Sequence, residues 1–466
     1  MQIDVLRQAF NGRLYTSDSE MEPFLTDWRK KWKGEALAVV QPDTTEDVAA
    51  IMRLCHSHGV PVVPQGGNTG LSGGATPDTS KRAVVLSLMR LKRIRSIDIE
   101  NNSLVAEAGV ILEEIHNVAS SVNRLFPLKL ASQGSCTIGG NLATNAGGIQ
   151  VLRYGNTREL CLGVEVVTPE GEIWNGLREL RKNNTGYSLR DLYIGSEGTL
   201  GVITAASIKL FPVPKTTLLS ILSVASPQDA LRLLHLSQEN FGAELTAFEI
   251  MSDFSVSLVE KNIHDRQLPL SSRGDWYVFM EISSSYDEKQ VREALEQLLE
   301  QGMEIGLIQD GALCQNISQF RKLWAIREDI AEAQVLEGKS IKHDISVPLS
   351  KIADFIEAVT NKVEQQYPAL RQVVYGHIGD GNLHYNFCPA APEYAADFMK
   401  LEAEVNRAVH DIVDQFAGSI SAEHGLGVLR RDEAERYKSA TEIKLMSDIK
   451  KALDPQTLMN PGKVLR

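Results

Sequence analysis

The sequence predicts an α+β protein built from more than one domain, and three observations lead to this prediction. The chain has 466 residues, which is too long for a single ordinary core. Helical and strand-like hydrophobic patterns alternate along it. Glycine-rich stretches gather in the first part, whereas glycine is sparse between about residues 215 and 367. We therefore expect two or three domains, with the first boundary at Pro212 and Pro214.

The composition is that of a soluble globular protein, with 43% hydrophobic and 23% charged residues. The 48 basic and 60 acidic residues give a net charge of −12, so we expect no nucleic-acid partner, which would require a basic surface. Five scattered cysteines without CxxC spacing favour a reducing compartment. The sequence has neither a signal-peptide pattern nor a long apolar run, and we therefore expect a cytoplasmic protein without an integral membrane segment.

Several helices and strands can be placed from the residue pattern. A helix is predicted from Thr44, whose side chain caps it, to Gly59, which ends it. Residues 60–63 form a short buried strand, and residues 83–88 form the next one. Beyond the boundary, residues 276–282 are predicted as a strand and residues 288–299 as a helix.

The first glycine loop, residues 64–74, suits a phosphate-bearing ligand. It is not a P-loop, because no Gly-Lys-Ser/Thr follows, and it lacks the helix that a dinucleotide fingerprint requires. Its unobstructed backbone N–H groups, with Asn68, Thr69 and Ser72 as further donors, can hold a pyrophosphate. Taken alone, a mobile surface loop explains these residues equally well.

Two further stretches favour the ligand site over the mobile loop. The second glycine region covers residues 132–148, and the third glycine segment, residues 195–201, leads into a strand from Val202. Both mix small residues with polar side chains. Three such stretches in one domain are best explained as walls of one long polar site.

These motifs resemble the FAD-binding domain of the vanillyl-alcohol-oxidase type, also called the PCMH type. The resemblance covers roughly residues 32–214 and rests on PxxPxGGxTGLSGG, GSxxxGGNxATNAGG and the third glycine segment. It implies a two-subdomain domain in which the first loop and residues 139–148 hold the pyrophosphate and the flavin edge, while the third segment contacts the adenine side. Several relatives attach FAD covalently through a histidine in the first loop, and Asn68 at that place predicts non-covalent FAD.

The residues predicted to bind FAD lie in these stretches and in one C-terminal position. They are Pro64, Gln65, Gly66, Gly67, Asn68, Thr69, Gly70, Leu71, Ser132, Gln133, Ser135, Thr137, Gly139, Gly140, Asn141, Ala143, Thr144, Gly147, Gly148, Glu197, Gly198, Gly201, Ile203 and Asn460.

Two histidines in the second half of the chain are placed to share a metal ion. Strand patterns flank Asp380-Gly381, a pair that favours a two-residue hairpin turn. In that register His377 faces His384 with Cβ atoms roughly 4.5–5.5 Å apart, and Tyr375 and Asn386 lie on the same face.

A third metal ligand is offered by Glu423, which stands beside His424 in a glycine-framed segment. Two histidines and one carboxylate, with coordination positions left open, are typical of a catalytic metal site. The alternative is three unrelated polar residues that are satisfied by hydrogen bonds.

Both segments resemble the FAD-linked D-2-hydroxy acid dehydrogenases, in particular the D-2-hydroxyglutarate dehydrogenase branch, and this likeness covers nearly the whole chain. It rests on the motifs GHxGDGNLHxN and SAEHGxG. The resemblance implies that His377, His384 and Glu423 bind a divalent metal, zinc or manganese. It also implies that Asn386 lies beside the substrate and that His424 is the general base.

The same resemblance assigns a carboxylate clamp to Arg327 and Lys342; without it, each would be an ordinary solvated cation. A threonine that helps to hold the distal carboxylate of 2-hydroxyglutarate falls at Ala331, whose side chain cannot form a hydrogen bond. This departure weakens the case for 2-hydroxyglutarate itself.

The resemblance predicts a PCMH-type FAD-binding domain at 1–214, a substrate (cap) domain with an antiparallel sheet and flanking helices at 215–418, and a segment at 419–466 that returns to the FAD domain. The implied activity is FAD-dependent, metal-assisted oxidation of a D-2-hydroxy acid (2-hydroxyglutarate-like, lactate or malate) to the 2-oxo acid, with hydride transfer to the flavin. Electrons would pass to an electron-transfer flavoprotein or a quinone, and a homodimer is a further expectation. The alternatives are a D-lactate dehydrogenase, a flavin oxidase of another alcohol, a flavin-free metal hydrolase and a nucleotide-binding regulatory module.

Overall fold

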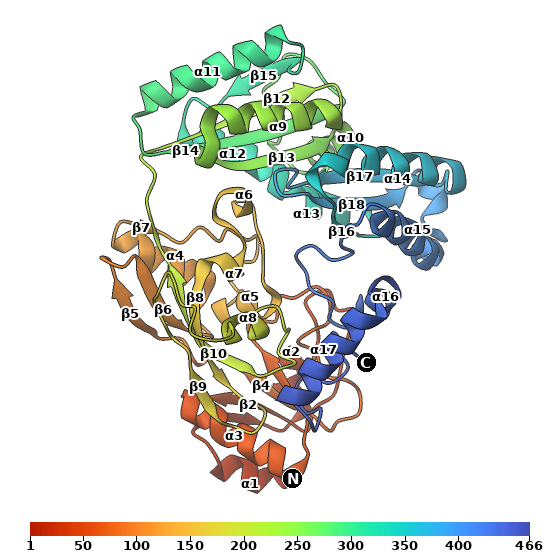
Figure 1. Ribbon diagram of the computed structural model, residues 1–466. Coiled ribbons are helices and arrows are strands. Elements are labelled where there is room, and N and C mark those ends of the chain that lie inside the picture. The colour runs from red at the N-terminus through yellow and green to blue at the C-terminus, as the bar shows by residue number, and fades with distance from the viewer. The chain divides into compact units, whose positions relative to one another are not determined.

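The chain folds into two compact units. Figure 1 shows them coloured from red at the N-terminus to blue at the C-terminus. The computed structural model describes residues 1–466, apart from the side chain of Pro392. The first unit comprises residues 1–148, 155–213 and 423–466, and the second unit residues 149–154 and 214–422. The predicted boundaries lie after residues 214 and 418. The prediction did not include the assignment of residues 149–154 to the second unit.

The first unit contains two larger β-sheets, and helix α3 (Thr45–His58) packs against strands of both. The four-stranded sheet has the order β1-β2-β4-β3, with parallel pairing of β2 with β4 and of β3 with β4. The five-stranded sheet has the order β5-β6-β10-β8-β9 and is antiparallel. The strands of this unit are β1 (Gly12–Tyr15), β2 (Ala38–Pro42), β3 (Val62–Gln65), β4 (Val84–Ser87), β5 (Ile94–Asp98), β6 (Ser103–Glu107), β7 (Arg124–Leu125), β8 (Cys161–Val167), β9 (Ile173–Asn175), β10 (Val202–Lys209) and β11 (Phe211–Pro212).

The other helices of the first unit lie at its edges and in its connections. Residues 423–466 contribute two of them, and Met459 is buried in the core formed by α3 and the four-stranded sheet. The helices are α1 (Ile3–Gln8), α2 (Asp18–Leu25), α4 (Leu112–Ser121), α5 (Ile138–Thr144), α7 (Thr157–Leu160), α8 (Leu189–Tyr193), α16 (Arg431–Tyr437) and α17 (Ala440–Leu453).

The predicted start and end of the first long helix are confirmed. The Thr44 hydroxyl accepts a hydrogen bond from the Asp47 backbone N–H at 3.1 Å, and Gly59 ends α3 in the left-handed conformation. The strand expected at 60–63 is shifted to Val62–Gln65, because Pro61 has no N–H to contribute to the pairing. The second glycine region is not all loop, since α5 occupies its middle and is capped by Thr137.

The second unit is built on a seven-stranded antiparallel sheet with the order β15-β12-β14-β13-β17-β18-β16. Helices α9, α11 and α14 form one layer on this sheet, and α10, α12 and α13 pack on the opposite face (Figure 1). The strands are β12 (Thr216–Val224), β13 (Leu245–Ser252), β14 (Trp276–Ser284), β15 (Asp310–Leu313), β16 (Asp344–Ser346), β17 (Leu370–Gly376) and β18 (Asn382–Pro389). The helices are α6 (Val151–Tyr154), α9 (Pro227–Phe241), α10 (Asp253–Asn262), α11 (Glu288–Glu304), α12 (Ile317–Glu328), α13 (Ile330–Glu337), α14 (Ile352–Gln366) and α15 (Glu402–Gln415).

Mixed helices and sheets in both units confirm the predicted α+β class. The strand expected at 276–282 and the helix expected at 288–299 are both present, and each extends a few residues further toward the C-terminus. Along the described chain, none of the helices combines the length and the apolar character that crossing a membrane requires.

Candidate active site

The first glycine loop lies directly against the second glycine region. A Cβ placed at Gly66 would lie 2.4 Å from Oγ1 of Thr137, and one at Gly67 would lie 2.0 Å from the Ser135 carbonyl oxygen. Both contacts are shorter than a side chain tolerates. These two positions therefore need glycine because the first loop packs closely against the Thr137 side chain and the Ser135 backbone of the second region.

The third glycine segment joins the same cluster. A Cβ at Gly198 would lie 3.1 Å from Cγ of Pro64 in the first loop. The carboxylate of Glu197 accepts hydrogen bonds from the backbone N–H groups of Leu426 at 2.7 Å and Gly427 at 2.8 Å. Burial raises the pKa of Glu197, and these two donors oppose the rise. The side chain of Glu197 thus fastens the C-terminal segment, a role that the prediction of a cofactor contact did not include.

The segment that carries His424 is held against the first glycine loop within the first unit. The Ser72 hydroxyl is 3.2 Å from the carbonyl oxygens of His424 and Gly425. Nδ2 of Asn460 donates to the carbonyl oxygens of Gly74 at 2.8 Å and Glu197 at 2.7 Å. The first and third glycine-rich stretches therefore contact the C-terminal segment of the chain.

Several side chains predicted to bind FAD have partners inside the protein. Gln65 donates to two backbone carbonyls, Asn68 donates to Thr26, Thr137 caps α5, and Thr144 donates to Gly140. The side chain of Ile203 is buried on β10. These side chains are therefore engaged within the protein, and their predicted contacts with FAD stay a prediction.

Three buried polar atoms in this cluster lack a hydrogen-bond partner among the described residues. They are Nδ2 of Asn141, Oγ1 of Thr76 and Oδ1 of Asn460. A buried polar atom without a partner costs about 1–3 kcal/mol, and a polar ligand would remove that cost. Unpartnered donors and acceptors beside close-packed glycine loops fit a large polar cofactor such as FAD.

In the second unit, the predicted two-residue hairpin is wrong. β17 and β18 pair antiparallel, but Tyr375, rather than His377, lies opposite His384. The strands are joined by the longer loop 377–381, in which the Gly379 N–H donates to the carbonyl of Phe248 on β13 at 3.1 Å. The register differs from the prediction by two residues, so the side chains of both strands keep their predicted face.

The three residues predicted to bind a metal have ligand atoms close together. One nitrogen from each of His377 and His384 and one oxygen from Glu423 lie within 4.8 Å of one another. Glu423 directly follows Ala422, the last residue of the second unit, whose N–H donates to the carbonyl of Asp344. Two imidazoles and a carboxylate within this span fit a divalent cation with open coordination positions.

Arg327, predicted as part of the carboxylate clamp, is buried on α12. Its Nε donates to Oε2 of Glu249 at 2.7 Å, and its guanidinium carbon lies 4.8 Å from the centre of the Tyr375 ring. Within the described part of the chain, its two terminal nitrogens form no hydrogen bond. They are the two donors that a bidentate grip on a carboxylate needs.

The sequence prediction missed Glu249, which bridges Arg327 and His377. Its side chain is fully buried, and Oε1 lies 2.5 Å from Nδ1 of His377. Burial raises the pKa of this carboxyl, but the adjacent His377 and Arg327 outweigh that effect and lower it to about 2. The signal was available, since a lone glutamate in the otherwise apolar run of β13 is unusual.

Asn386 lies on β18, and Lys342 lies just before β16, the edge strand that pairs with β18. Oδ1 of Asn386 accepts from the backbone N–H of His343 at 3.0 Å, and its Nδ2 donates to Gln334 at 3.0 Å. One amide hydrogen of Asn386 is left for a substrate, so the predicted contact stays a prediction. Lys342 lies between residues that pair with β18 on either side, Ile341 and Asp344.

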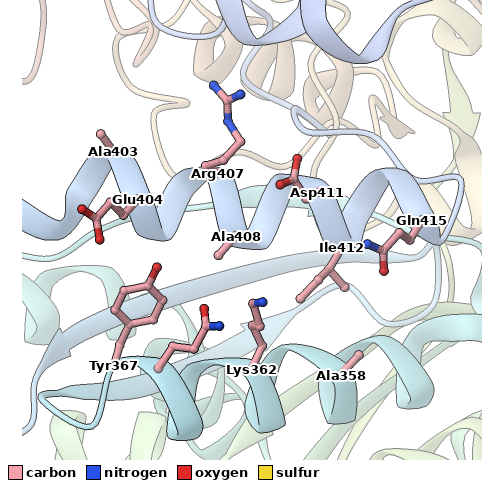
Figure 2. Close-up of a pocket in the computed structure, with 11 residues that line it drawn as sticks. Ala358, Lys362, Tyr367, Ala403, Glu404, Arg407, Ala408, Asp411, Ile412 and Gln415 are labelled. Atoms are coloured by element: carbon pink, nitrogen blue, oxygen red, sulfur yellow. The ribbon is translucent and has the colours of Figure 1, made fainter.

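A groove of about 730 Å³ in the second unit lies between α14 and α15. Figure 2 shows Ala408 and Ile412 of α15 facing Lys362 of α14 across it. None of the predicted site residues belongs to the described lining of this groove.

Family models match both halves of the chain. A model described as "FAD binding domain" matches residues 36–176, and one described as "FAD linked oxidases, C-terminal domain" matches residues 213–464. Both models assign FAD, so the FAD binding predicted from the glycine motifs and the FAD-linked oxidoreductase class predicted from the motifs of the second half are confirmed.

Two solved structures share the fold. The structure of p-cresol methylhydroxylase has a TM-score of 0.75 and 15% identity, and it covers 99% of this chain and 96% of its own. The 4-ethylphenol oxidase of Gulosibacter chungangensis has a TM-score of 0.73 and 19% identity, and it covers 97% of this chain and 94% of its own. They confirm the predicted PCMH-type architecture.

More similar sequences come from one group of dehydrogenases. The mitochondrial D-2-hydroxyglutarate dehydrogenase of Arabidopsis thaliana is 40% identical over 99% of this chain and 81% of its own length. The D-2-hydroxyglutarate dehydrogenase of Xanthomonas citri pv. viticola is 38% identical over 98% of this chain and 96% of its own length. This chain belongs to the FAD-linked oxidase family, in the group that contains these D-2-hydroxyglutarate dehydrogenases.

Proposed function

We propose that this protein oxidises a D-2-hydroxy acid to the corresponding 2-oxo acid with non-covalent FAD and a divalent metal ion. The proposal is carried by one observation: ligand atoms of His377, His384 and Glu423 lie within 4.8 Å of one another. Arg327, hydrogen-bonded to the same buried carboxylate as His377, supplies a carboxylate-binding group nearby. The names of the relatives from Arabidopsis thaliana and Xanthomonas citri pv. viticola support the same substrate class.

The clamp residues bind the substrate through its acid group. Arg327 offers two parallel N–H donors, which match the two oxygens of a carboxylate, and Lys342 adds a second positive charge. Asn386 contributes its remaining amide hydrogen to the bound acid.

The reacting end of the substrate loses a proton and a hydride. A divalent cation, zinc or manganese, held by the two histidines and Glu423 lowers the pKa of the C2 hydroxyl when it is bound. His424 accepts the hydroxyl proton, a task that suits an imidazole near neutral pH. The glycine-rich loops would hold FAD, which would supply the acceptor for the C2 hydride, and an electron-transfer flavoprotein or a quinone would be the final acceptor of the two electrons.

A D-lactate dehydrogenase is the second candidate, and it rests on two observations. Ala331 on α13 offers no hydrogen bond to a distal carboxylate, which a small substrate such as lactate does not have. A relative from Schizosaccharomyces pombe, 36% identical over 96% of this chain, is named as a putative D-lactate dehydrogenase. Malate is intermediate in length between lactate and 2-hydroxyglutarate, because its second carboxylate is closer to C2 than that of 2-hydroxyglutarate.

A dye-reduction screen tests the proposal. The purified protein is assayed with D- and L-lactate, malate, 2-hydroxyglutarate and longer 2-hydroxy acids, with and without a chelator. We expect yellow protein, activity with at least one D-2-hydroxy acid, and loss of that activity in the chelator. Bleaching of the flavin by none of these acids would overturn the substrate class, and full activity in the metal-free protein would overturn the metal role.

A further inference from the structure

The buried carboxylate of Glu249 uses each of its oxygens for a different neighbour. Oε1 lies 2.5 Å from Nδ1 of His377, and Oε2 lies 2.7 Å from Nε of Arg327. The side chain is 0% exposed, and those of His377 and Arg327 are 10% and 9% exposed. The contact is therefore dry, and water cannot replace either partner at low cost.

We infer that Glu249 is a positioning residue that orients two groups of the active site at once, the metal-binding imidazole of His377 and the substrate-binding guanidinium of Arg327. The inference rests on the function proposed above, because it concerns how the same site is held.

For His377, the contact decides which ring nitrogen faces a cation. An ionised carboxylate only accepts hydrogen bonds, so Nδ1 of His377 carries the hydrogen and Nε2 keeps its lone pair. Carboxylates that hold metal-binding histidines in this manner fix the tautomer and the ring orientation, and their loss typically costs roughly 10–100-fold in metal affinity. Glu249 thus selects Nε2 of His377 as the ligand atom.

For Arg327, the contact fixes the direction of the guanidinium plane. Nε is held by Glu249, and the Tyr375 ring covers one face of the group with its centre 4.8 Å away. Nε2 of Gln334 in turn donates a hydrogen bond to the Tyr375 hydroxyl oxygen at 3.3 Å. Glu249 and Tyr375 thus hold the guanidinium at Nε and on one face, and the two terminal nitrogens of Arg327 are left to bind a ligand.

Sharing one carboxylate has a consequence that a purely structural ion pair would not have. If Glu249 only stabilised the fold, its replacement would lower the unfolding temperature and leave the remaining folded enzyme with normal ligand binding. If it positions both groups, replacement lowers metal affinity and raises KM for the acid together, while the flavin content is unchanged.

The test compares Glu249→Gln with Glu281→Gln. Glutamine has nearly the same shape, but its single carbonyl oxygen can accept from only one of His377 and Arg327. Glu281 is a matched control, since it is also a buried glutamate and lies on the neighbouring strand β14. It accepts a hydrogen bond at 3.0 Å from Nε1 of Trp324, which lies on α12 like Arg327.

Metal content is measured by elemental analysis after dialysis against graded chelator concentrations, and KM is measured by dye reduction. For Glu249→Gln we expect a loss of metal affinity of roughly 10–100-fold and a raised KM, with FAD bound at one per chain. We expect Glu281→Gln to match wild type within about twofold in both measurements. Glu249→Asp, which keeps two acceptor oxygens, should recover part of the lost affinity, and it serves as the readout if Glu249→Gln does not fold.

Two results would count against this inference in distinguishable ways. Wild-type metal affinity and KM in folded Glu249→Gln would overturn the positioning role and leave the proposed function intact. A wild-type protein that holds no divalent metal under any condition would overturn the proposed metal site, and the inference with it.

Discussion

The imidazole of His384 lies directly opposite Tyr375 in the β17–β18 ladder, with ring centres 5.0 Å apart. His377 lies just beyond the end of β17, and its ring centre is 5.9 Å from that of His384. One histidine is thus held rigidly by a strand, whereas the other depends on a loop and on Glu249.

Replacing His384 by alanine should remove the metal without removing the flavin. The variant loses one of three proposed ligands, so we expect its metal affinity to fall by at least the roughly 10–100-fold that loss of an outer partner costs. Elemental analysis and the flavin absorption spectrum measure the two cofactors separately. His235→Ala on α9, which removes an exposed histidine of the same unit, is the control. Undiminished metal content in His384→Ala would show that the ligand set is misassigned.

Replacing Arg327 by alanine should weaken substrate binding more than it weakens flavin binding. A hydrogen bond to a charged group contributes about 1.5–3 kcal/mol, so we expect kcat/KM to fall roughly 10–150-fold, mainly through KM. Steady-state dye reduction measures this. Arg321→Ala, at an exposed position of the same helix, is the control. A normal KM in Arg327→Ala would remove this residue from the carboxylate clamp.

The sequence was informative where local chemistry decides the structure. The cap of Thr44, the stop at Gly59 and the three glycine-rich stretches all follow from residue type and spacing. It was misleading at the 377–381 loop, where the Gly379 N–H donates a hydrogen bond to the distant strand β13. No local residue pattern predicts this contact. Glu249 and Arg327 lie far apart in sequence, and their pairing depends on α12 packing over β13.

Replacing Gly67 by alanine should release FAD. The new Cβ would lie 2.0 Å from the Ser135 carbonyl oxygen, so the first glycine loop would have to move away from the second region. We expect protein with far-UV circular dichroism like that of wild type and with FAD affinity reduced by tenfold or more, since an atomic overlap of this size costs at least about 1–3 kcal/mol. Gly134→Ala in the second region has its nearest contact at 3.6 Å and should bind FAD normally. Tight FAD binding by Gly67→Ala would contradict the close packing of these loops.

The acid stability of the first unit should depend on Glu165, a buried carboxylate on β8. It accepts from both terminal nitrogens of Arg95 at 3.1 and 3.0 Å and from the hydroxyls of Thr45 and Thr204. Burial raises the pKa of Glu165, but these hydrogen bonds and the Arg95 charge outweigh it and lower the pKa below the usual 4.5. Its stabilising contribution is therefore complete above pH 4.5 and is lost as the pH falls through the lowered value in the folded protein.

At pH 7, Glu165→Gln should lower the free energy of unfolding by about 1.5–3 kcal/mol, the usual worth of a hydrogen bond to a charged group. Because wild type loses this contribution in acid and the variant has none to lose, the gap in unfolding temperature should narrow as the pH is lowered below 4.5. Flavin fluorescence on heating reports the first unit directly, since release of FAD follows the loss of its binding loops. Glu170→Gln, at an exposed position of the same unit, should stay close to wild type throughout. A gap between wild type and Glu165→Gln that stays constant with pH would mean that the carboxylate does not carry this acid sensitivity.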